Sequence, residues 1–102
     1  MKPHFVYIIT NAGRRTLYTG MTDDLFRRLM QHYQHRGDPR HFSTKYHCYY
    51  LLMYEEYPSF EDAMRREKQL KGWRREKKWN LIRSVNPNLE FMQLPQNMRY
   101  TI

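Results

Sequence analysis

The stretch His4-Phe5-Val6-Tyr7-Ile8-Ile9-Thr10-Asn11 decides the fold, because it is rich in β-branched and aromatic residues and is apolar on both sides. A segment of this composition is typical of a buried strand. Residues 12–15 (AGRR) supply a turn, and residues 16–20 (TLYTG) predict the strand that returns beside the first. A turn centred between residues 12 and 13 would place Tyr7 opposite Tyr18, with both phenols on one face of the hairpin.

A helix is predicted directly after the hairpin. Thr22 is the expected N-cap, and Asp23 and Asp24 would stabilise the positive end of the helix dipole. Apolar residues then recur at helical spacing to about Gln34. Residues 35–47 (HRGDPRHFSTKYH) are polar and are predicted to form a basic loop.

The second half of the chain predicts one strand and two helices. Residues 49–56 (YYLLMYEE) are typical of a strand, and Ser59 begins a partial capping box for a helix that Gly72 would end. Residues 73–85 predict a last helix that turns three residues toward the core: Trp79, Ile82 and Val85.

The element order β-β-α-β-α-α predicts an α+β fold, a three-stranded antiparallel sheet flanked by helices. The length of 102 residues allows one domain, which we expect over residues 1–85, followed by a partly irregular C-terminal tail over residues 86–102. The single cysteine, Cys48, excludes an internal disulfide. Because no apolar run is long enough to span a bilayer or to form a signal peptide, we expect a cytoplasmic protein without a membrane partner.

The positive charge is concentrated in one part of the chain. Residues 65–83 contain nine basic residues and two acidic ones, a net charge of +7 out of the total of +8. A solvated helical face is one interpretation of such a run. The strong asymmetry favours nucleic-acid contact instead.

Glu67 is unexpected in its helix, because it follows the apolar stripe of Phe60, Ala63 and Met64 at the next stripe position. A carboxylate on that side needs a compensating charge. An ion pair with an arginine and a bound divalent metal both remain open. In the first helix, Arg28 and His32 share one face at i, i+4 spacing, although surface solvation alone would account for such a pair.

Together these residues resemble the GIY-YIG nuclease superfamily, in particular its small stand-alone bacterial branch related to the N-terminal nuclease domain of the excision-repair C subunit. The resemblance covers about residues 4–90. It is carried by an ordered set of motifs: Phe5-Val6-Tyr7, Tyr18-Thr19-Gly20, residues 22–28 (TDDLFRR) with His32, residues 63–68 (AMRREK), residues 71–73 (KGW) and Asn86-Pro87. Phe5 stands where the name-giving triplet has glycine. Asn86 is the candidate for the asparagine that larger members carry near the end of the domain, with Asn80 as the second choice.

The resemblance implies a metal-dependent endonuclease that hydrolyses DNA phosphodiester bonds. Glu67 would hold one Mg²⁺ or Mn²⁺ together with phosphate oxygens and water, and Arg28 would clamp a non-bridging oxygen. Tyr7 or Tyr18 would orient or deprotonate the attacking water, with His32 assisting. Gly20 would permit a close backbone approach or an unusual turn.

Nucleic-acid backbone contacts are expected from nine basic residues: Arg40, Lys45, Arg65, Lys68, Lys71, Arg74, Arg75, Lys77 and Lys78. Two alternatives stay open. One is a non-catalytic nucleic-acid-binding module that keeps the fold and the basic face. The other is an RNA- or protein-associated adaptor that uses the loop aromatics as its contact surface.

Overall fold

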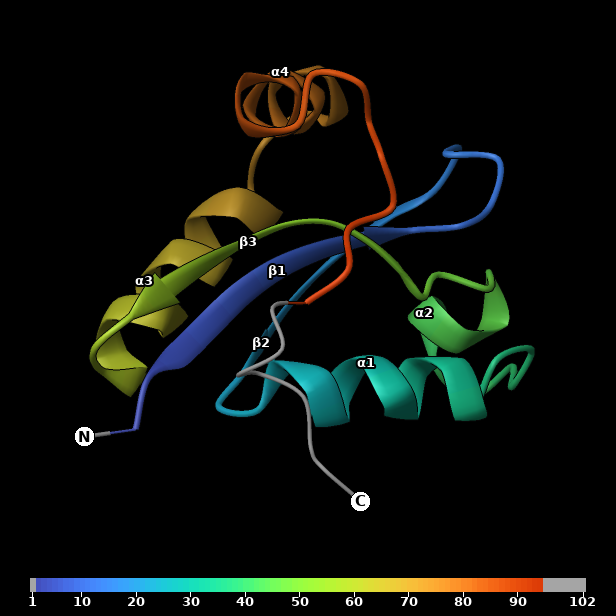
Figure 1. The fold of residues 1–102 in the computed structure, drawn as a ribbon, viewed down its shortest axis with the longest axis horizontal. Helices are drawn as coiled ribbons and strands as arrows, with labels where there is room; N and C mark the ends of the chain where they lie inside the picture. The colour runs from blue at the N-terminus through green and yellow to red at the C-terminus, as the bar shows by residue number, and fades with distance from the viewer. Residues whose placement is uncertain (1, 95–102) are drawn as a thin grey trace.

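The strand that opens the chain becomes the centre of the sheet, in a computed structural model that describes residues 2–94 (Figure 1). The strand order is β2-β1-β3, and both neighbours run antiparallel to β1. The elements are β1 (His4–Thr10), β2 (Leu17–Thr22), α1 (Leu25–Gln34), α2 (Phe42–Lys45), β3 (Tyr50–Tyr57), α3 (Phe60–Lys71) and α4 (Arg75–Val85). The predicted α+β class and element order are confirmed, with the single-turn helix α2 added where a loop was expected.

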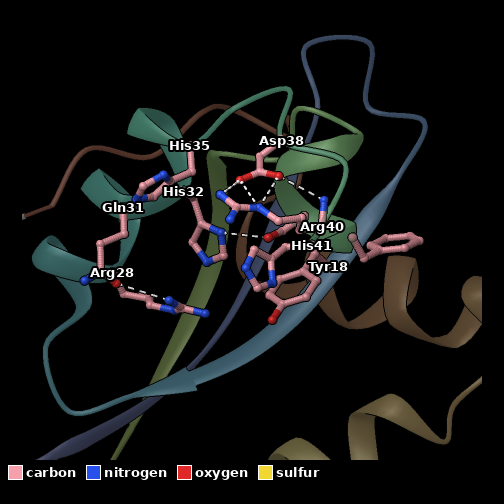
Figure 2. Close-up of a pocket in the computed structure, with 10 residues that line it drawn as sticks. Tyr18, Arg28, Gln31, His32, His35, Asp38, Arg40 and His41 are labelled. Atoms are coloured by element: carbon pink, nitrogen blue, oxygen red, sulfur yellow. Dashed lines mark hydrogen bonds and ion pairs between the residues drawn. The ribbon is translucent and has the colours of Figure 1, made fainter.

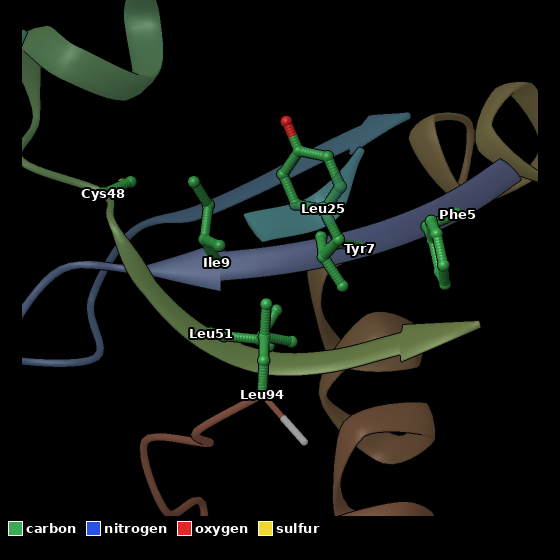
Figure 3. Close-up of a cluster of buried hydrophobic side chains, with 7 residues drawn as sticks. All are labelled: Phe5, Tyr7, Ile9, Leu25, Cys48, Leu51 and Leu94. Atoms are coloured by element: carbon green, nitrogen blue, oxygen red, sulfur yellow. The ribbon is translucent and has the colours of Figure 1, made fainter. Parts of the chain in front are cut away.

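Helices cover both faces of the sheet, so the side chains of β1 are buried in alternating directions. On the α1 side, the odd-numbered residues of β1 pack with residues from α1, β3 and the chain that follows α4. Figure 3 shows this cluster: Phe5, Tyr7, Ile9, Leu25, Cys48, Leu51 and Leu94. The other side is covered by α3 and α4, and its cluster consists of Val6, Ile8, Leu52, Met53, Ala63, Leu70 and Ile82.

A bulge in β3 explains why two successive residues of that strand pack on the same side. Ile8 pairs with Met53 and Ile9 pairs with Leu51, so the register skips Leu52. Leu52 and Met53 both join the cluster under α3 and α4. An unbulged strand would send them to opposite faces.

The predicted pairing of Tyr7 with Tyr18 is wrong. Tyr7 pairs with Gly20, and Tyr18 pairs with Ile9. The turn is longer than expected because the Asn11 side chain accepts hydrogen bonds from the backbone N–H groups of residues 15 and 16, and Arg14 adopts a positive φ of 56°. The observed pairing is therefore shifted by two residues from the predicted one. Because side chains alternate between the two faces of a strand, this even shift keeps both tyrosines on the same face, as diagonal neighbours.

The start of α1 also differs from the prediction. Asp24, rather than Thr22, is the N-cap, and its carboxylate accepts from the backbone N–H of Arg27. The Thr22 hydroxyl accepts from the N–H of Asp24 and so supports the cap from outside. At α3 the predicted capping by Ser59 is confirmed, because its hydroxyl accepts from the N–H of Asp62.

The two last helices bury less apolar surface than expected. In α3 only Ala63 and Leu70 are buried, whereas Phe60 and Met64 are exposed. The face of α3 that packs on the sheet is therefore narrower than the apolar stripe predicted from the sequence. In α4 the predicted inward position of Val85 is wrong, because its side chain is 62% exposed at the end of the helix.

The chain after α4 crosses the edge of β3 to the α1 side of the sheet (Figure 1). The N–H of Met92 donates to the carbonyl of Leu51, and the Leu94 side chain is buried against the core. Residues 86–94 lack helix and strand but are packed, and residues 95–102 lie outside the described part. Over residues 2–94, no helix is long and apolar enough to cross a membrane.

Candidate active site

The Tyr7 side chain lies across the backbone of Gly20 on the neighbouring strand. A Cβ atom at position 20 would come within 2.9 Å of Cε1 of the Tyr7 ring and closer still to the phenol oxygen. Real Cβ atoms do not approach other atoms this closely. Glycine at position 20 therefore leaves the space that the Tyr7 ring fills.

His32 connects Tyr7 to the loop that follows α1. Its Nε2 lies 2.8 Å from the Tyr7 hydroxyl, and its Nδ1 lies 2.9 Å from Oγ of Ser43 on α2. All three side chains are buried, and His32 is only 3% exposed. The interpretation of His32 as a solvated surface residue is therefore wrong. Both ring nitrogens have a polar partner, so this string of three residues fixes the imidazole in place.

Tyr18 and Arg28 complete the group. The Tyr18 ring packs against both Tyr7 and His32, with centroid separations of 6.4 Å and 5.4 Å. Burial alone would lower the pKa of Arg28, but interactions with the hydroxyls of Tyr7 and Tyr18 raise it. Nη1 of Arg28 also donates to the Gln31 side chain over 3.1 Å. The guanidinium is thus held, fully charged, beside both tyrosines.

The neighbouring groups set the protonation of His32 and Tyr7. Burial, followed by the positive charge of Arg28, lowers the pKa of His32 to about 4. Burial also raises the pKa of Tyr7, against the opposing influence of Arg28. At neutral pH the imidazole is uncharged and the phenol keeps its proton, so the string is electrically neutral next to a cation.

A cleft of about 590 Å³ opens in front of this group (Figure 2). Tyr18, Arg28 and His32 reach it from β2 and α1, while Tyr7 lies behind them and is closed off from solvent. The remaining lining residues are Gln31, His35, Asp38, Arg40, His41, Phe42 and Ser43. The walls therefore combine cations, imidazoles and one exposed phenyl ring.

Glu67 approaches the group from α3, on the other side of the sheet. Its side chain is 21% exposed, and its carboxylate forms an ion pair with Lys71 over 3.2 Å. The negative charge of Glu67 contributes to the raised pKa of Tyr7, which places the carboxylate within electrostatic reach of the phenol. Tyr7 lies across Gly20 of β2, and α3 packs against both β1 and β2 from the other side of the sheet.

The geometry and the motifs agree with a comparison to known proteins, in which residues 3–80 match the family described as the GIY-YIG catalytic domain. The chain belongs to the GIY-YIG family. UPF0213 proteins of Staphylococcus aureus strains Mu3 and Mu50 are each 32% identical to it over 83 residues, which covers 81% of this chain and 98% of theirs. The solution NMR structure of the UPF0213 protein BH0048 from Bacillus halodurans is 30% identical, with a TM-score of 0.55 over 84% of this chain and 88% of that one.

The donor set of this GIY-YIG protein suits a metal ion that substrate helps to bind. Within residues 2–94 no three His, Cys, Asp or Glu side chains come together as a metal site. Mg²⁺ is commonly bound by one or two carboxylates, with substrate phosphates and waters as the other ligands. Glu67 is partly exposed and fits that mode once its carboxylate is released from Lys71 or shared with it.

Asn86 does not join the cleft. Its Nδ2 donates to the carbonyls of Leu52 and Glu90, and its Oδ1 accepts from the N–H of Glu90, all within 3.1 Å. These hydrogen bonds use both polar atoms of the buried Asn86 amide, which thereby holds the end of α4 to β3. Asn80, the second choice, lies on the exposed surface of α4.

The nine basic residues expected to contact nucleic acid lie in two places. Arg40 and Lys45 belong to the loop and helix beside the cleft, where Arg40 forms an ion pair with Asp38 over 2.6 Å. The other seven lie on α3, on α4 and between them, over the opposite face of the sheet. Burial, followed by the positive charges of Lys71 and Arg75, lowers the pKa of Lys78 there.

Ser43 is the residue that the sequence reasoning missed. It lies within the stretch predicted to be a loop, and no spacing rule connects it to His32. A single-turn helix brings its hydroxyl under the imidazole. The available signal was the His-Phe-Ser-Thr-Lys run (residues 41–45), in which Ser and Thr among polar residues are typical of a short helical turn.

Proposed function

We propose that this GIY-YIG protein is a metal-dependent endonuclease that hydrolyses phosphodiester bonds of DNA. The observation that carries the proposal is the buried Tyr7–His32–Ser43 string next to the Arg28 guanidinium at the back of a cationic cleft. Serine, histidine and tyrosine side chains that are joined by consecutive hydrogen bonds can accept a proton or transfer it. The resemblance of its motifs to the excision-repair branch is the reason for proposing a role in DNA repair, and we propose that this role lies in the cytoplasm.

Arg28 is proposed to hold a non-bridging oxygen of the scissile phosphate. A guanidinium matches phosphate in shape and charge, and this one keeps its proton because its pKa is raised. It also lines the cleft, where a phosphate can reach it. Fixed before substrate arrives, it would stabilise the charge that develops on the phosphate.

Tyr18 is proposed to orient the attacking water, and Tyr7 is proposed to support Tyr18 from the buried side of the cleft. Tyr18 lines the cleft, whereas Tyr7 is shielded from solvent and bonded to His32. Tyr7 is therefore a positioning residue, which holds His32 and Arg28 in register with Tyr18. Under this proposal, the two tyrosines that the sequence left equivalent have different roles.

His32 would become a better proton acceptor when substrate binds. Its pKa is lowered first by burial and then by the charge of Arg28. A phosphate against Arg28 offsets the second cause, whereas burial remains, so the pKa of His32 should be lowered less in the complex than in the free protein. A phosphodiester in the cleft would thus make proton uptake by His32 easier.

Glu67 is the proposed protein ligand for Mg²⁺ or Mn²⁺, with phosphate oxygens and waters as the other ligands. When bound, such a cation supplies charge stabilisation at the phosphate and at the leaving oxygen.

The test is a cleavage assay on purified protein with labelled nicked, flapped, branched, duplex and single-stranded DNA, with Mg²⁺, Mn²⁺ or chelator. Cleavage in the presence of metal, lost in Arg28→Ala and in Tyr18→Phe, supports the proposal. Arg27→Ala is the matched control for Arg28→Ala, because Arg27 is the neighbouring arginine of α1, is exposed and does not line the cleft. Absence of cleavage on every substrate would reject it.

A non-catalytic nucleic-acid-binding module is the second candidate. The ion pair between Glu67 and Lys71 favours it, because a paired carboxylate is less available to a metal. The same assay decides, since this candidate predicts metal-independent binding and no product. Here Lys71→Ala is informative: freeing Glu67 should strengthen metal-dependent cleavage in an enzyme and leave a binding module inactive.

A further inference from the structure

Two exposed aromatic rings stand beside the cleft. Phe42 is 53% exposed and Tyr46 is 44% exposed, and their ring centroids are 4.8 Å apart. Phe42 lines the cleft and lies nearly parallel to the Tyr18 ring, at an interplanar angle of 23° and a centroid separation of 6.5 Å. Isolated exposed apolar residues need no explanation, but adjoining rings at the wall of a polar cleft do.

The surroundings of these rings suit a nucleotide. The Lys45 ammonium lies over the Tyr46 ring at 5.4 Å, and Arg28, His35 and His41 line the cleft next to Phe42. Aromatic faces combined with cations are the means by which proteins bind the bases and phosphates of unpaired strands. Tyr18 contacts both Phe42 and His32, so the rings lie one side chain away from the groups proposed to act on the phosphate.

A second run of aromatic residues shows what a purely structural arrangement looks like in this protein. Tyr33, Tyr49, Tyr50 and Phe91 follow one another at centroid separations between 4.1 and 5.0 Å. Guanidinium groups cover both ends of this run, Arg36 over Tyr33 and Arg14 over Phe91. The inner rings of that run, Tyr49 and Tyr50, are half-buried, and exposed Tyr33 at its end is covered by Arg36. Exposed Phe42 instead lines the cleft.

We infer that Phe42 and Tyr46 form a stacking platform for an unpaired nucleobase next to the phosphate to be cleaved. The inference rests on the proposed function and names its substrate class: nucleic acid with a single-stranded segment or end at the reaction site. Inside a duplex each base already stacks on its neighbours, so only an unpaired base can present a face to the platform. The chemistry is shared by DNA and RNA.

The test measures binding without divalent metal, in the presence of chelator, using oligonucleotides that contain 2-aminopurine, whose fluorescence is quenched by stacking. Single-stranded DNA, single-stranded RNA and blunt duplex DNA are compared. We expect quenching with the single strands only. Phe42→Leu should weaken single-strand binding about 5- to 150-fold, the range seen for loss of one stacked base, and leave duplex binding unchanged.

Phe60→Leu is the matched control, since Phe60 is also a phenylalanine at a helix start, is 47% exposed and lies on α3. Phe42→Trp should restore quenching and affinity. Equal loss with single strands and duplex, unchanged quenching in Phe42→Leu, or an equal effect of Phe60→Leu would overturn the platform. Because no metal is present, an inactive protein can still bind in this way, and a cleaving protein can fail this test. The two proposals therefore fail separately.

Discussion

The two faces of the sheet carry different parts of the proposed activity. Under α1 and α2 lie buried, mostly neutral polar groups fixed by short hydrogen bonds, and one arginine aimed into a cleft. Over α3 and α4 lie exposed cations with little buried chemistry. Precise positioning and electrostatic attraction are thus built on separate layers, and the charge of Glu67 on α3 acts across the sheet on Tyr7.

The largest effect should come from Glu67→Gln, which removes the connection between the two layers. Cleavage should fall by orders of magnitude, because the proposed metal ligand loses its charge, while binding without metal persists. The half-exposed pair with Lys71 contributes only about 0.3–0.5 kcal/mol, so the melting temperature should hardly change. Glu76→Gln, an exposed carboxylate on α4, is the control in both assays. Wild-type cleavage by Glu67→Gln would show that the layers act independently.

Acid should lower the free energy of unfolding through His32, which is buried on the α1 side of the sheet. The pKa of His32 is about 4 in the folded protein and about 6.5 when unfolded, so the unfolded chain binds the proton more tightly between these values. Stability due to this group is therefore complete above about pH 6.5 and declines as the pH falls to about 4, by up to about 3 kcal/mol. Urea unfolding across this range, with NMR titration of the His32 ring, measures the effect. A normal titration of His32 near 6.5 would contradict it.

Gly20→Ala should destabilise the protein by about 1–3 kcal/mol, because the added methyl group would overlap the Tyr7 ring. The displaced phenol should also loosen its bond to His32. Gly13→Ala is the matched control, since its Cβ would meet nothing closer than 3.7 Å. Equal unfolding free energies for the two variants would mean that Tyr7 has room to move.

Ser43→Ala should act on the imidazole without touching the cleft cations. Loss of the partner of buried Nδ1 costs about 1–3 kcal/mol and frees His32 to change tautomer. The ¹⁵N chemical shifts of the two ring nitrogens report the tautomer directly, and Ser43→Thr, which keeps the hydroxyl, should preserve it. A tautomer unaffected by Ser43→Ala would assign the orientation of His32 to Tyr7 alone.

The smallest effect on the chemistry should come from the α4 side. Alanine at Arg74, Arg75, Lys77 and Lys78 should flatten the dependence of log affinity on log salt by about 0.9 for each phosphate that is no longer neutralised. Cleavage at low salt should remain, since none of these residues lines the cleft. An unchanged salt dependence would move the binding surface to the cleft side.

The sequence predicted the sheet, the main helices and the shared face of Tyr7, Tyr18, Arg28 and His32, because alternation and helical spacing fix which side a residue occupies. It failed where long-range contacts decide. The hairpin register depends on the Asn11 side chain bonds, and α2 depends on packing against α1. The burial of His32 and its bond to Ser43 follow from that added turn. The run at residues 41–45 favours a short turn, but nothing in it connects Ser43 to His32.

The crossing of residues 86–94 over β3 also bears on aggregation. An edge strand offers unpaired backbone groups to other chains. Here the N–H of Met92 and the amide of Asn86 take up the outward carbonyls of Leu51 and Leu52, at the bulge of that strand. The protein thereby closes this stretch of β3 to strand addition by a second molecule, using a segment that the family match over residues 3–80 does not include.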